Sequence, residues 1–336
     1  MRSPPTDLAP ERLRMALAES WQLRAGSVEY RPVGGGGHHW VLTGTDGPRH
    51  FVTVDDLDDK DWLGDTRQAV FEALRRALGT AAALRHQAGL EFVVAPVPAR
   101  NGELLRRLDG RYAVSVFPFL AGRSYPFGPY PDERLRGQAL EMIAALHQST
   151  VAVRDLAAPH ELTFAGRADL DAFLLDPGRR WNGGPFSPAA HRLAAPRATD
   201  LARLVASFGH LADVTAPARG NPVITHGEPH PANLMSVGGR LLLIDWDTAA
   251  LAPPERDVSM IVAGPGDTDH YRQTAGRELD PAVMILYRLR WYLDDLGSAI
   301  RMFRGQHLDT PDTRQWQQDL APMLERLPHW LDLLED

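Results

Sequence analysis

The stretch that decides the fold lies between residues 225 and 247. It reads Thr225-His226-Gly227-Glu228-Pro229-His230-Pro231-Ala232-Asn233-Leu234-Met235 and, eight residues later, Leu243-Ile244-Asp245-Trp246-Asp247. Short apolar runs at residues 222–225 and 241–244 predict two buried strands on either side of a loop. Proline lacks an amide hydrogen, so the two prolines exclude a helix in the loop. We therefore expect a rigid strand–loop–strand element that carries polar side chains.

The spacing of these polar side chains indicates a particular chemistry. The loop carries the Glu228 carboxylate, the Asn233 amide follows five residues later, and the Asp245 carboxylate follows twelve residues after that. Phosphoryl transfer uses a base that orients the attacking hydroxyl, and amide and carboxylate oxygens that hold Mg²⁺ on the phosphates. A zinc-protease site is a poor alternative, because that motif places Glu directly after the first His on a helix. The pattern favours magnesium-dependent phosphoryl transfer.

The N-terminal part of the chain reads as a small α+β unit. Strand signals predict strands at 27–33, 39–42, 50–54, 92–98 and 111–117. Helix signals predict helices at 10–24 and 66–86. Asp65 is the expected cap of the second helix. The glycine run Gly34–Gly37 falls between the first two strands. It lacks the Gly-Lys-Ser/Thr ending of a Walker loop, so it is either a flexible turn or a cover over bound phosphates.

Helical spacing dominates after residue 122. Apolar positions predict a helix at 132–148, mostly helical structure at 160–213, and a helical tail from residue 280. The segment 117–122 between the two parts is the expected hinge. We therefore predict an α+β chain with a small β-rich part followed by a larger, mainly helical part.

The motif resembles that of a known enzyme family. Together with Ala252-Pro253-Pro254-Glu255-Arg256-Asp257, the 226–247 pattern is similar to the aminoglycoside phosphotransferase-like kinases, with the nearest likeness to spectinomycin phosphotransferases. The resemblance covers nearly the whole chain. It implies a bilobal protein-kinase-like fold, with a nucleotide-binding lobe at residues 1–120 and a helical lobe at residues 121–336 that holds the catalytic loop and the acceptor site.

The resemblance also implies roles for individual residues. Glu228 would be the catalytic residue, and Asn233 and Asp245 would bind Mg²⁺. His226 and Asp257 would order the loop. ATP or GTP would be held by Gly35, Gly36, Gly37, Phe119 and Leu120. Five further residues could line a pocket for a cationic acceptor: Trp246, Asp247, Trp291, Asp294 and Asp295. Core packing explains the two tryptophans equally well, and a solvated helix face is the favoured interpretation of Asp294 and Asp295.

Two positions depart from the family pattern. Glu228 stands where the family has Asp, and Thr53 stands where the family has a phosphate-binding Lys on the third strand. The only lysine, Lys60, lies among five aspartates, where we expect a solvated position and no role in catalysis. The departures keep three alternatives open: a small-molecule O-phosphotransferase acting on an antibiotic-like or sugar-like acceptor, a metabolic sugar or amino-alcohol kinase, and a catalytically weak kinase-like binding protein.

Composition narrows the classes of partner. The chain has 36 Lys and Arg against 43 Asp and Glu, a net charge of −7 that disfavours nucleic acid and anionic membranes. The absence of cysteine excludes disulfides, thiolate zinc sites and cysteine nucleophiles. No apolar signal segment precedes residue 20, so we expect a cytoplasmic protein that acts as a monomer or weak dimer on a small-molecule acceptor.

Overall fold

The computed structural model describes residues 1–5, 7–45 and 47–335, which group into two compact units. Unit 1 comprises residues 1–160 and 221–280, and unit 2 comprises residues 161–220 and 281–336. The units therefore interleave along the chain. The functional lobes predicted at 1–120 and 121–336 group the chain differently and stay a prediction.

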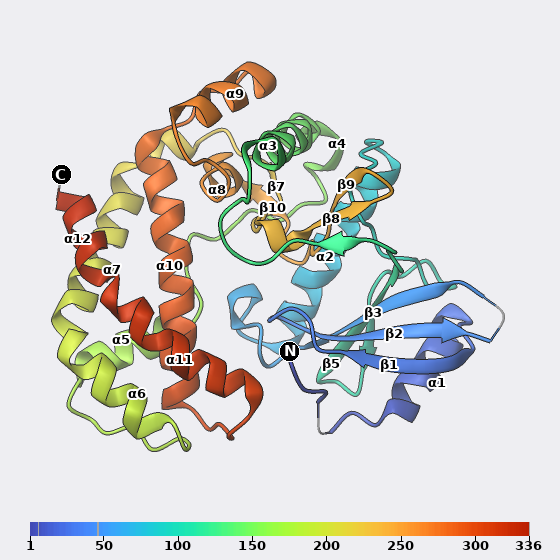
Figure 1. The fold of residues 1–336 in the computed structure, drawn as a ribbon, viewed down its shortest axis with the longest axis horizontal. Coiled ribbons are helices and arrows are strands. Elements are labelled where there is room, and N and C mark those ends of the chain that lie inside the picture. Colours follow the sequence, from blue (N-terminus) through green and yellow to red (C-terminus); the bar gives the residue numbers. More distant parts are fainter. Residues whose placement is uncertain (6, 46, 336) are drawn as a thin grey trace. The chain divides into compact units, whose positions relative to one another are not determined.

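Unit 1 begins with a five-stranded antiparallel sheet of order β1-β2-β3-β5-β4 (Figure 1). Its strands are β1 (Ala25–Arg31), β2 (His38–Gly44), β3 (Arg49–Asp56), β4 (Arg106–Leu108) and β5 (Tyr112–Pro118). Helix α1 (Pro10–Trp21) buries Leu13 and Leu17 in one core cluster with Trp40 and Val52 of the sheet. Helix α2 (Arg67–His86) contributes Leu74 to a second cluster. The predicted sequence of strands and helices is confirmed here, apart from one strand.

The strand predicted at 92–98 was wrong. Pro96 and Pro98 have no amide hydrogen to donate, so the segment cannot pair as a regular strand. Instead, Val93 forms an isolated bridge with Leu243, and the Val97 amide donates to Val116 O at 2.7 Å. The strand that pairs with β5 at the sheet edge is the short β4.

The cap predicted for the second helix was one residue early. Thr66, not Asp65, is the N-cap of α2, because its side chain accepts a hydrogen bond from the Ala69 amide at 3.1 Å. Both residue types are good caps. The extended backbone of Thr66 sets the start of the helix, and the sequence does not reveal that backbone conformation.

The rest of unit 1 holds two small sheets and four helices. One sheet has the order β6-β8-β9, formed by β6 (Arg123–Ser124), β8 (Leu234–Val237) and β9 (Arg240–Leu243). The other pairs β7 (Val223–Thr225) with β10 (Ala250–Ala252). The helices are α3 (Glu133–Gln148), α4 (Thr150–Val153), α8 (Glu255–Val258) and α9 (Pro265–Ala275). Strands β7 and β9 confirm the two strands predicted around the loop, but only β7 is fully buried, and the sequence analysis missed β8, which lies between them.

Unit 2 is helical, as the sequence predicted. It consists of α5 (Arg167–Leu175), α6 (Ser187–Ala194), α7 (Ala198–Val214), α10 (Pro281–Arg304), α11 (Pro311–Glu325) and α12 (Leu327–Glu335). The long α10 supplies many of the buried residues of the core, including Leu289, Leu293 and Ile300. Its backbone closely approaches the start of α5, where a Cβ on Gly166 would lie 2.1 Å from Gly297 O. Glycine at this position is therefore a packing requirement.

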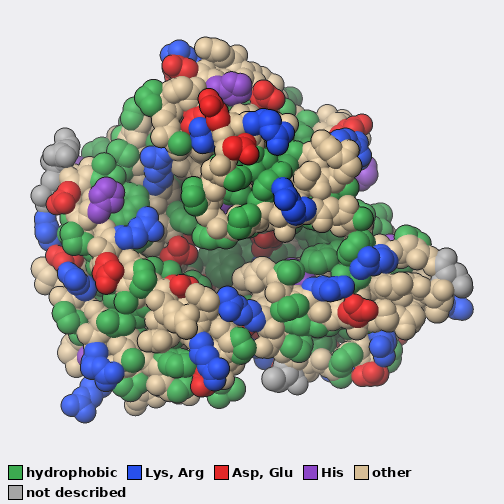
Figure 2. Space-filling model, in the orientation of Figure 1, with side chains coloured by type: hydrophobic (Ala, Val, Ile, Leu, Met, Phe, Trp, Pro, Cys, Tyr) green, Lys and Arg blue, Asp and Glu red, His purple; other side chains and the backbone are tan. Residues whose placement is uncertain are grey.

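The charged side chains are dispersed. On the face drawn in Figure 2, Lys and Arg side chains alternate with Asp and Glu, without a large patch of one sign. Among the residues that the structure describes, no helix has the length and apolar character needed to cross a membrane.

Candidate active site

Two backbone segments are tied together at the centre of unit 1. Residues 226–233 link β7 to β8, and residues 244–247 follow β9. The Ile244 amide donates to Asn233 O at 3.0 Å, and His226 Nε2 donates to Ile244 O at 2.9 Å. The first bond joins Asn233 to Ile244, the residue that precedes Asp245. The structure thus brings together residues that are twelve positions apart in the sequence.

Asp257 anchors the loop from α8. Its carboxylate accepts hydrogen bonds from the His226 amide at 2.8 Å and from the Gly227 amide at 2.6 Å, and it lies 3.1 Å from His147 Nε2. Burial opposes the charge on Asp257, but the hydrogen bond and charge of His147 hold its pKa below the usual value. A Cβ on Gly227 (φ 103°) would lie 2.3 Å from Arg256 Nη2, so this position requires glycine. These contacts support the loop-ordering roles predicted for His226 and Asp257.

The sequence analysis missed His147, which completes this network. His147 is 1% exposed at the end of α3, and its Nδ1 lies 2.6 Å from the Tyr271 hydroxyl. A histidine on the apolar face of an amphipathic helix was the available signal, because a buried imidazole needs polar partners.

We expect Asp257→Asn to destabilise the protein and to slow turnover. An amide keeps the shape but places an NH₂ group among groups that also donate, so at least one buried donor loses its acceptor. The expected loss is about 3 kcal/mol in the free energy of unfolding, measured by denaturant titration. Asp269→Asn is the matched control, since Asp269 pairs with Arg272 at an exposed site and its loss is expected to change stability by under about 0.5 kcal/mol. Equal stability of the two variants would contradict the anchoring role.

Glu228 and Asn233 are linked through the backbone. Asn233 Nδ2 donates to Glu228 O at 2.9 Å, which leaves Oδ1 as the atom that can ligate a cation. The Glu228 side chain is 32% exposed, and its carboxylate lies 4.0 Å from His230 Nε2. A carboxylate that is fixed at its backbone and reachable by solvent can serve as a base for an incoming hydroxyl.

An aromatic segment lies beside this base, and the sequence analysis missed it. The Tyr130 hydroxyl donates to Pro229 O, and the Phe127 ring meets the His230 ring edge-on at 5.0 Å between centroids. Phe127 is nonetheless 67% exposed. The available signal was the density of rings and prolines between residues 125 and 131, which indicates a stiff, exposed aromatic loop.

Asp245 has the features of a cation ligand. Its backbone is left-handed (φ 67°), a conformation that is uncommon for residues other than glycine and that clusters at functional sites. The surrounding protein and the neighbouring Asp247 carboxylate raise the pKa of Asp245 to about 7, although its side chain is exposed. A nearby cation would favour its charged form. Within the described ranges, no group of three or more His, Cys, Asp or Glu side chains forms a ready-made metal site. The residues present fit a divalent ion that takes further oxygens from a ligand.

The expected position of Lys60 was wrong. Lys60 is 1% exposed rather than solvated, and its Nζ lies 2.5 Å from Asp247 Oδ2 and 3.1 Å from Asp55 Oδ1. The two carboxylates raise the pKa of Lys60 against the effect of burial, so the side chain is a buried ammonium. Of the five aspartates around Lys60 in the sequence, Asp55 contacts it, and the second contact comes from a residue 187 positions away.

The glycine turn lies between the two strands that the sequence predicted, whereas the hinge at residues 117–122 stays a prediction. Gly34–Gly37 connects β1 to β2, and Thr53 occupies the expected position on β3, where its Oγ1 lies 3.2 Å from His39 Nδ1. Desolvation lowers the pKa of His39 to about 3, so its ring is neutral. At the hinge, the Phe119 amide already donates to Arg49 O at 3.3 Å. Leu120 is therefore the better candidate of the two for a backbone contact with a nucleobase.

The residues predicted for an acceptor pocket have other contacts. Trp246 is 1% exposed and packs edge-on against the His226 ring, so it is a core residue. Asp247 pairs with Lys60. In unit 2, the Asp294 carboxylate accepts from the Ala165 amide at 2.7 Å and pairs with Arg290.

The two remaining pocket candidates also lie on α10. Partial burial and the adjacent Asp294 raise the pKa of Asp295 to about 7. Trp291 is half-buried on the same helix. Their role as acceptor contacts stays a prediction.

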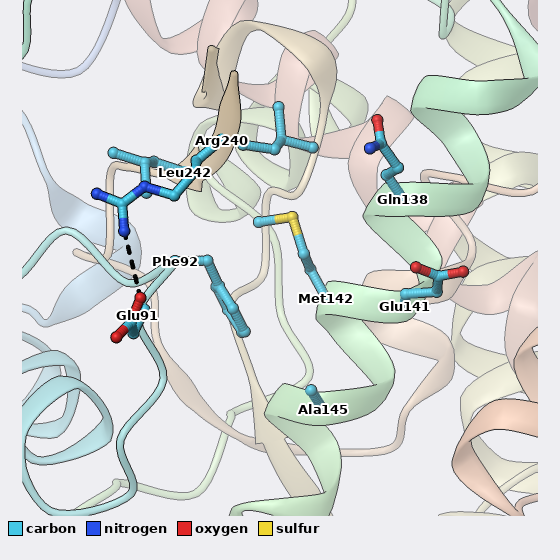
Figure 3. Close-up of a pocket in the computed structure, with 9 residues that line it drawn as sticks. Glu91, Phe92, Gln138, Glu141, Met142, Ala145, Arg240 and Leu242 are labelled. Atoms are coloured by element: carbon cyan, nitrogen blue, oxygen red, sulfur yellow. Dashed lines mark hydrogen bonds and ion pairs between the residues drawn. The ribbon is translucent and has the colours of Figure 1, made fainter. Parts of the chain in front are cut away.

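One surface pocket of unit 1 is separate from these residues. It has a volume of about 390 Å³, and its lining comes from α3, β9 and the segment after α2. Figure 3 shows Phe92 and Met142 facing into it, with the Arg240–Glu91 ion pair at one side. None of the predicted catalytic or metal-binding residues lines this pocket.

Comparisons with known proteins place this geometry in context. The chain is 28% identical over 242 residues to protein StrN of Streptomyces griseus. The aligned region covers 70% of this chain and 72% of StrN. The structure of spectinomycin phosphotransferase APH(9)-Ia with ADP and spectinomycin is similar, with a TM-score of 0.71 at 14% identity, covering 96% of this chain and 99% of that one.

A second solved structure shares the fold. The microcompartment-associated aminopropanol kinase has a TM-score of 0.61 at 16% identity, covering 97% of this chain and 98% of that one. The likenesses confirm the predicted protein-kinase-like fold. The model of the phosphotransferase enzyme family (APH) matches residues 29–299. Since this match spans far more than half of the sequence, the chain belongs to the phosphotransferase enzyme family.

Proposed function

We propose that this kinase transfers the γ-phosphate of ATP or GTP to a hydroxyl of a small antibiotic-like or sugar-like molecule. The observation that carries the proposal is the hydrogen-bonded element that holds Glu228, Asn233 and Asp245 together and that Asp257 anchors. The similar enzyme APH(9)-Ia was solved with ADP and spectinomycin, which supports a nucleotide and a small acceptor as the two substrates.

Glu228 is proposed to accept the proton of the acceptor hydroxyl. The acceptor oxygen forms a bond to the γ-phosphorus while the bond from that phosphorus to the β,γ-bridging oxygen breaks. The nucleoside diphosphate leaves with the bridging oxygen, and the hydroxyl proton passes to the Glu228 carboxylate. The partly exposed side chain and the fixed backbone of Glu228 suit this role.

Asn233 Oδ1 and the Asp245 carboxylate would hold Mg²⁺, which neutralises phosphate charge when it is bound. The exposure of Asp245 and its raised pKa fit a carboxylate that awaits a cation. We assign Gly35, Gly36 and Gly37 to the cover of the phosphates and Leu120 to the backbone contact with the base. We also propose a cytoplasmic location, where the nucleoside triphosphate would be available.

The acceptor is proposed to contact Phe127. This ring is exposed, yet its contact with His230 fixes it beside Glu228. We expect Phe127→Ala to raise the KM of the acceptor about fivefold and to leave the KM of the nucleotide within about twofold, since an aromatic contact contributes about 1 kcal/mol. Phe127→Tyr is the control that keeps the ring. A nucleotide KM that rises as much as the acceptor KM would place Phe127 at the nucleotide instead.

A triphosphate-consumption screen tests the proposal. The acceptors are spectinomycin, other aminocyclitols, nucleoside and peptide antibiotics, common sugars and amino alcohols, and ³¹P NMR identifies the phosphate ester formed. A phosphorylated antibiotic supports a resistance role, whereas a phosphorylated sugar or amino alcohol supports a metabolic kinase. Nucleotide binding without transfer to any acceptor would favour the kinase-like binding protein, the alternative that Glu228 and Thr53 keep open.

A further inference from the structure

A buried ammonium lies where phosphates are expected, and nothing in the proposed function uses it. Lys60 Nζ is held between Asp247 and Asp55, at 2.5 Å and 3.1 Å, with a side-chain exposure of 2%. It is the only lysine in 336 residues. The other Lys and Arg positions of the chain are all arginine, and its single lysine occupies a buried site.

The surroundings of Lys60 belong to the nucleotide side of the sheet. Asp55 lies two residues after Thr53 on β3, so the two side chains share a face of the strand. A Cβ added to Gly36 would lie 3.6 Å from Lys60 Nζ, and one added to Gly37 would lie 3.3 Å from Asp55 Oδ1. The glycine turn therefore covers the ammonium. The charge of Asp245 also acts on Lys60.

The segment that carries Lys60 is anchored independently of the ammonium. The Leu57 amide donates to Arg111 O at 2.9 Å, and Arg111 pairs with Asp56. After Lys60, the short 3₁₀ helix Asp61–Leu63 leads to Gly64, where a Cβ would lie 2.6 Å from that of Ala69. Lys60 is thus presented on a fixed segment between β3 and α2, and its Nζ lies 5.6 Å from the Trp62 ring centroid.

The charged groups around Lys60 indicate which kind of ligand this cluster would bind. Three carboxyl groups, those of Asp55, Asp245 and Asp247, act on the single ammonium of Lys60, so acidic groups outnumber the cation. Such a cluster repels a bare anion, but it suits a phosphate that arrives with a divalent cation. Thr53, at the strand position next to this cluster, offers no positive charge, so Lys60 is the nearest ammonium that can bond a phosphate oxygen.

We propose that Lys60, from the segment between β3 and α2, is the residue that contacts the nucleotide phosphates in this enzyme. Asp55 and Asp247 position the ammonium beneath the Gly34–Gly37 turn. The inference rests on the proposed nucleotide site. The competing role is a structural one, in which the ammonium joins the segment after β3 to the segment after β9 and never meets a phosphate.

The phosphate dependence of binding separates the two roles. Affinities of AMP-PNP with Mg²⁺ and of adenosine are measured by calorimetry for the wild-type protein and for Lys60→Met, together with the Tm of each. We expect AMP-PNP to bind Lys60→Met at least about tenfold more weakly, because a charge-assisted hydrogen bond is lost. Adenosine affinity is expected to stay within about twofold. An equal loss for both ligands, or no loss for either, would overturn the proposal.

Three further variants keep the test decisive. Lys60→Arg retains the charge and is expected to recover part of the AMP-PNP affinity. Arg75→Met is the matched control, because it removes an exposed cation on α2 that pairs with Glu72, and both affinities are expected to stay unchanged. If Lys60→Met does not fold, the double variant Lys60→Met/Asp55→Asn removes the unpaired buried carboxylate and is measured in its place.

The same measurements distinguish a failure of the Lys60 proposal from a failure of the proposed function. A wild-type protein that binds neither AMP-PNP nor adenosine would contradict the proposed function. A wild-type protein that binds AMP-PNP, with a Lys60→Met variant of equal affinity, would contradict the role of Lys60 alone.

Discussion

Asp245→Asn is expected to lower Mg²⁺-dependent phosphate transfer by about a thousandfold. The carboxylate is one of two proposed metal ligands, and the loss of about 4 kcal/mol of transition-state stabilisation corresponds to this factor. Asparagine is the informative replacement because, like aspartate, it tolerates the left-handed backbone found at φ 67°. Alanine would add backbone strain to the loss of charge. Initial rates measured across a Mg²⁺ titration provide the test.

The same variant is expected to keep its fold. Asp245 is exposed and its charge is disfavoured by Asp247, so removal of the charge is expected to leave the Tm of the ligand-free protein within a few degrees of wild type. AMP-PNP with Mg²⁺ is then expected to raise the Tm of the wild type but not of the variant. Asp171→Asn, at an exposed ion pair with Arg167, is the control. Unchanged rates and unchanged Mg²⁺ dependence in Asp245→Asn would contradict the assignment of this ligand.

The strand–loop–strand element could be predicted because its signals are local. Short apolar runs, two prolines and a glycine fix the backbone between β7 and β8, and these are properties of neighbouring residues. The helices were predictable for the same reason. The 92–98 strand failed where two local signals conflicted, since apolar alternation favours a strand and proline opposes it. The structure shows that the missing amide hydrogens decided the outcome.

The position of Lys60 could not be predicted from its neighbours. A lysine among aspartates normally indicates a solvated loop, yet Lys60 is buried and pairs with Asp55, the first of the five. Its second partner, Asp247, comes from the segment after β9, and sequence spacing carries no information about such a contact. His147 was missed for a similar reason, because its partner Asp257 lies 110 residues away. Long-range polar contacts of buried groups were thus the part that required a structure.

The second large expected effect is the loss of phosphate transfer when Glu228, the proposed base, loses its charge. Glu228→Gln keeps the size of the side chain and removes its charge, and we expect transfer to fall by about a thousandfold, within the range for loss of a general base. Nucleotide affinity is expected to stay within about twofold, because the proposed phosphate and metal contacts come from other residues. Single-turnover assays with AMP-PNP binding as the parallel measurement provide the test. Loss of nucleotide binding in Glu228→Gln would move Glu228 from the acceptor to the nucleotide.

Glu228→Asp then asks whether the site is built for the longer side chain. Aspartate is shorter by one methylene, about 1.5 Å. The backbone cannot make up this length, because the Glu228 amide donates to His226 Nδ1 at 3.2 Å and its carbonyl accepts from Asn233 at 2.9 Å. A displacement of about 1 Å can cost about a hundredfold in rate, so we expect Glu228→Asp to lower the rate by this order. A rate that rises instead would mean that the loop still has the geometry of an aspartate site. The natural protein would then be a weakened kinase, and binding would be its better-supported function.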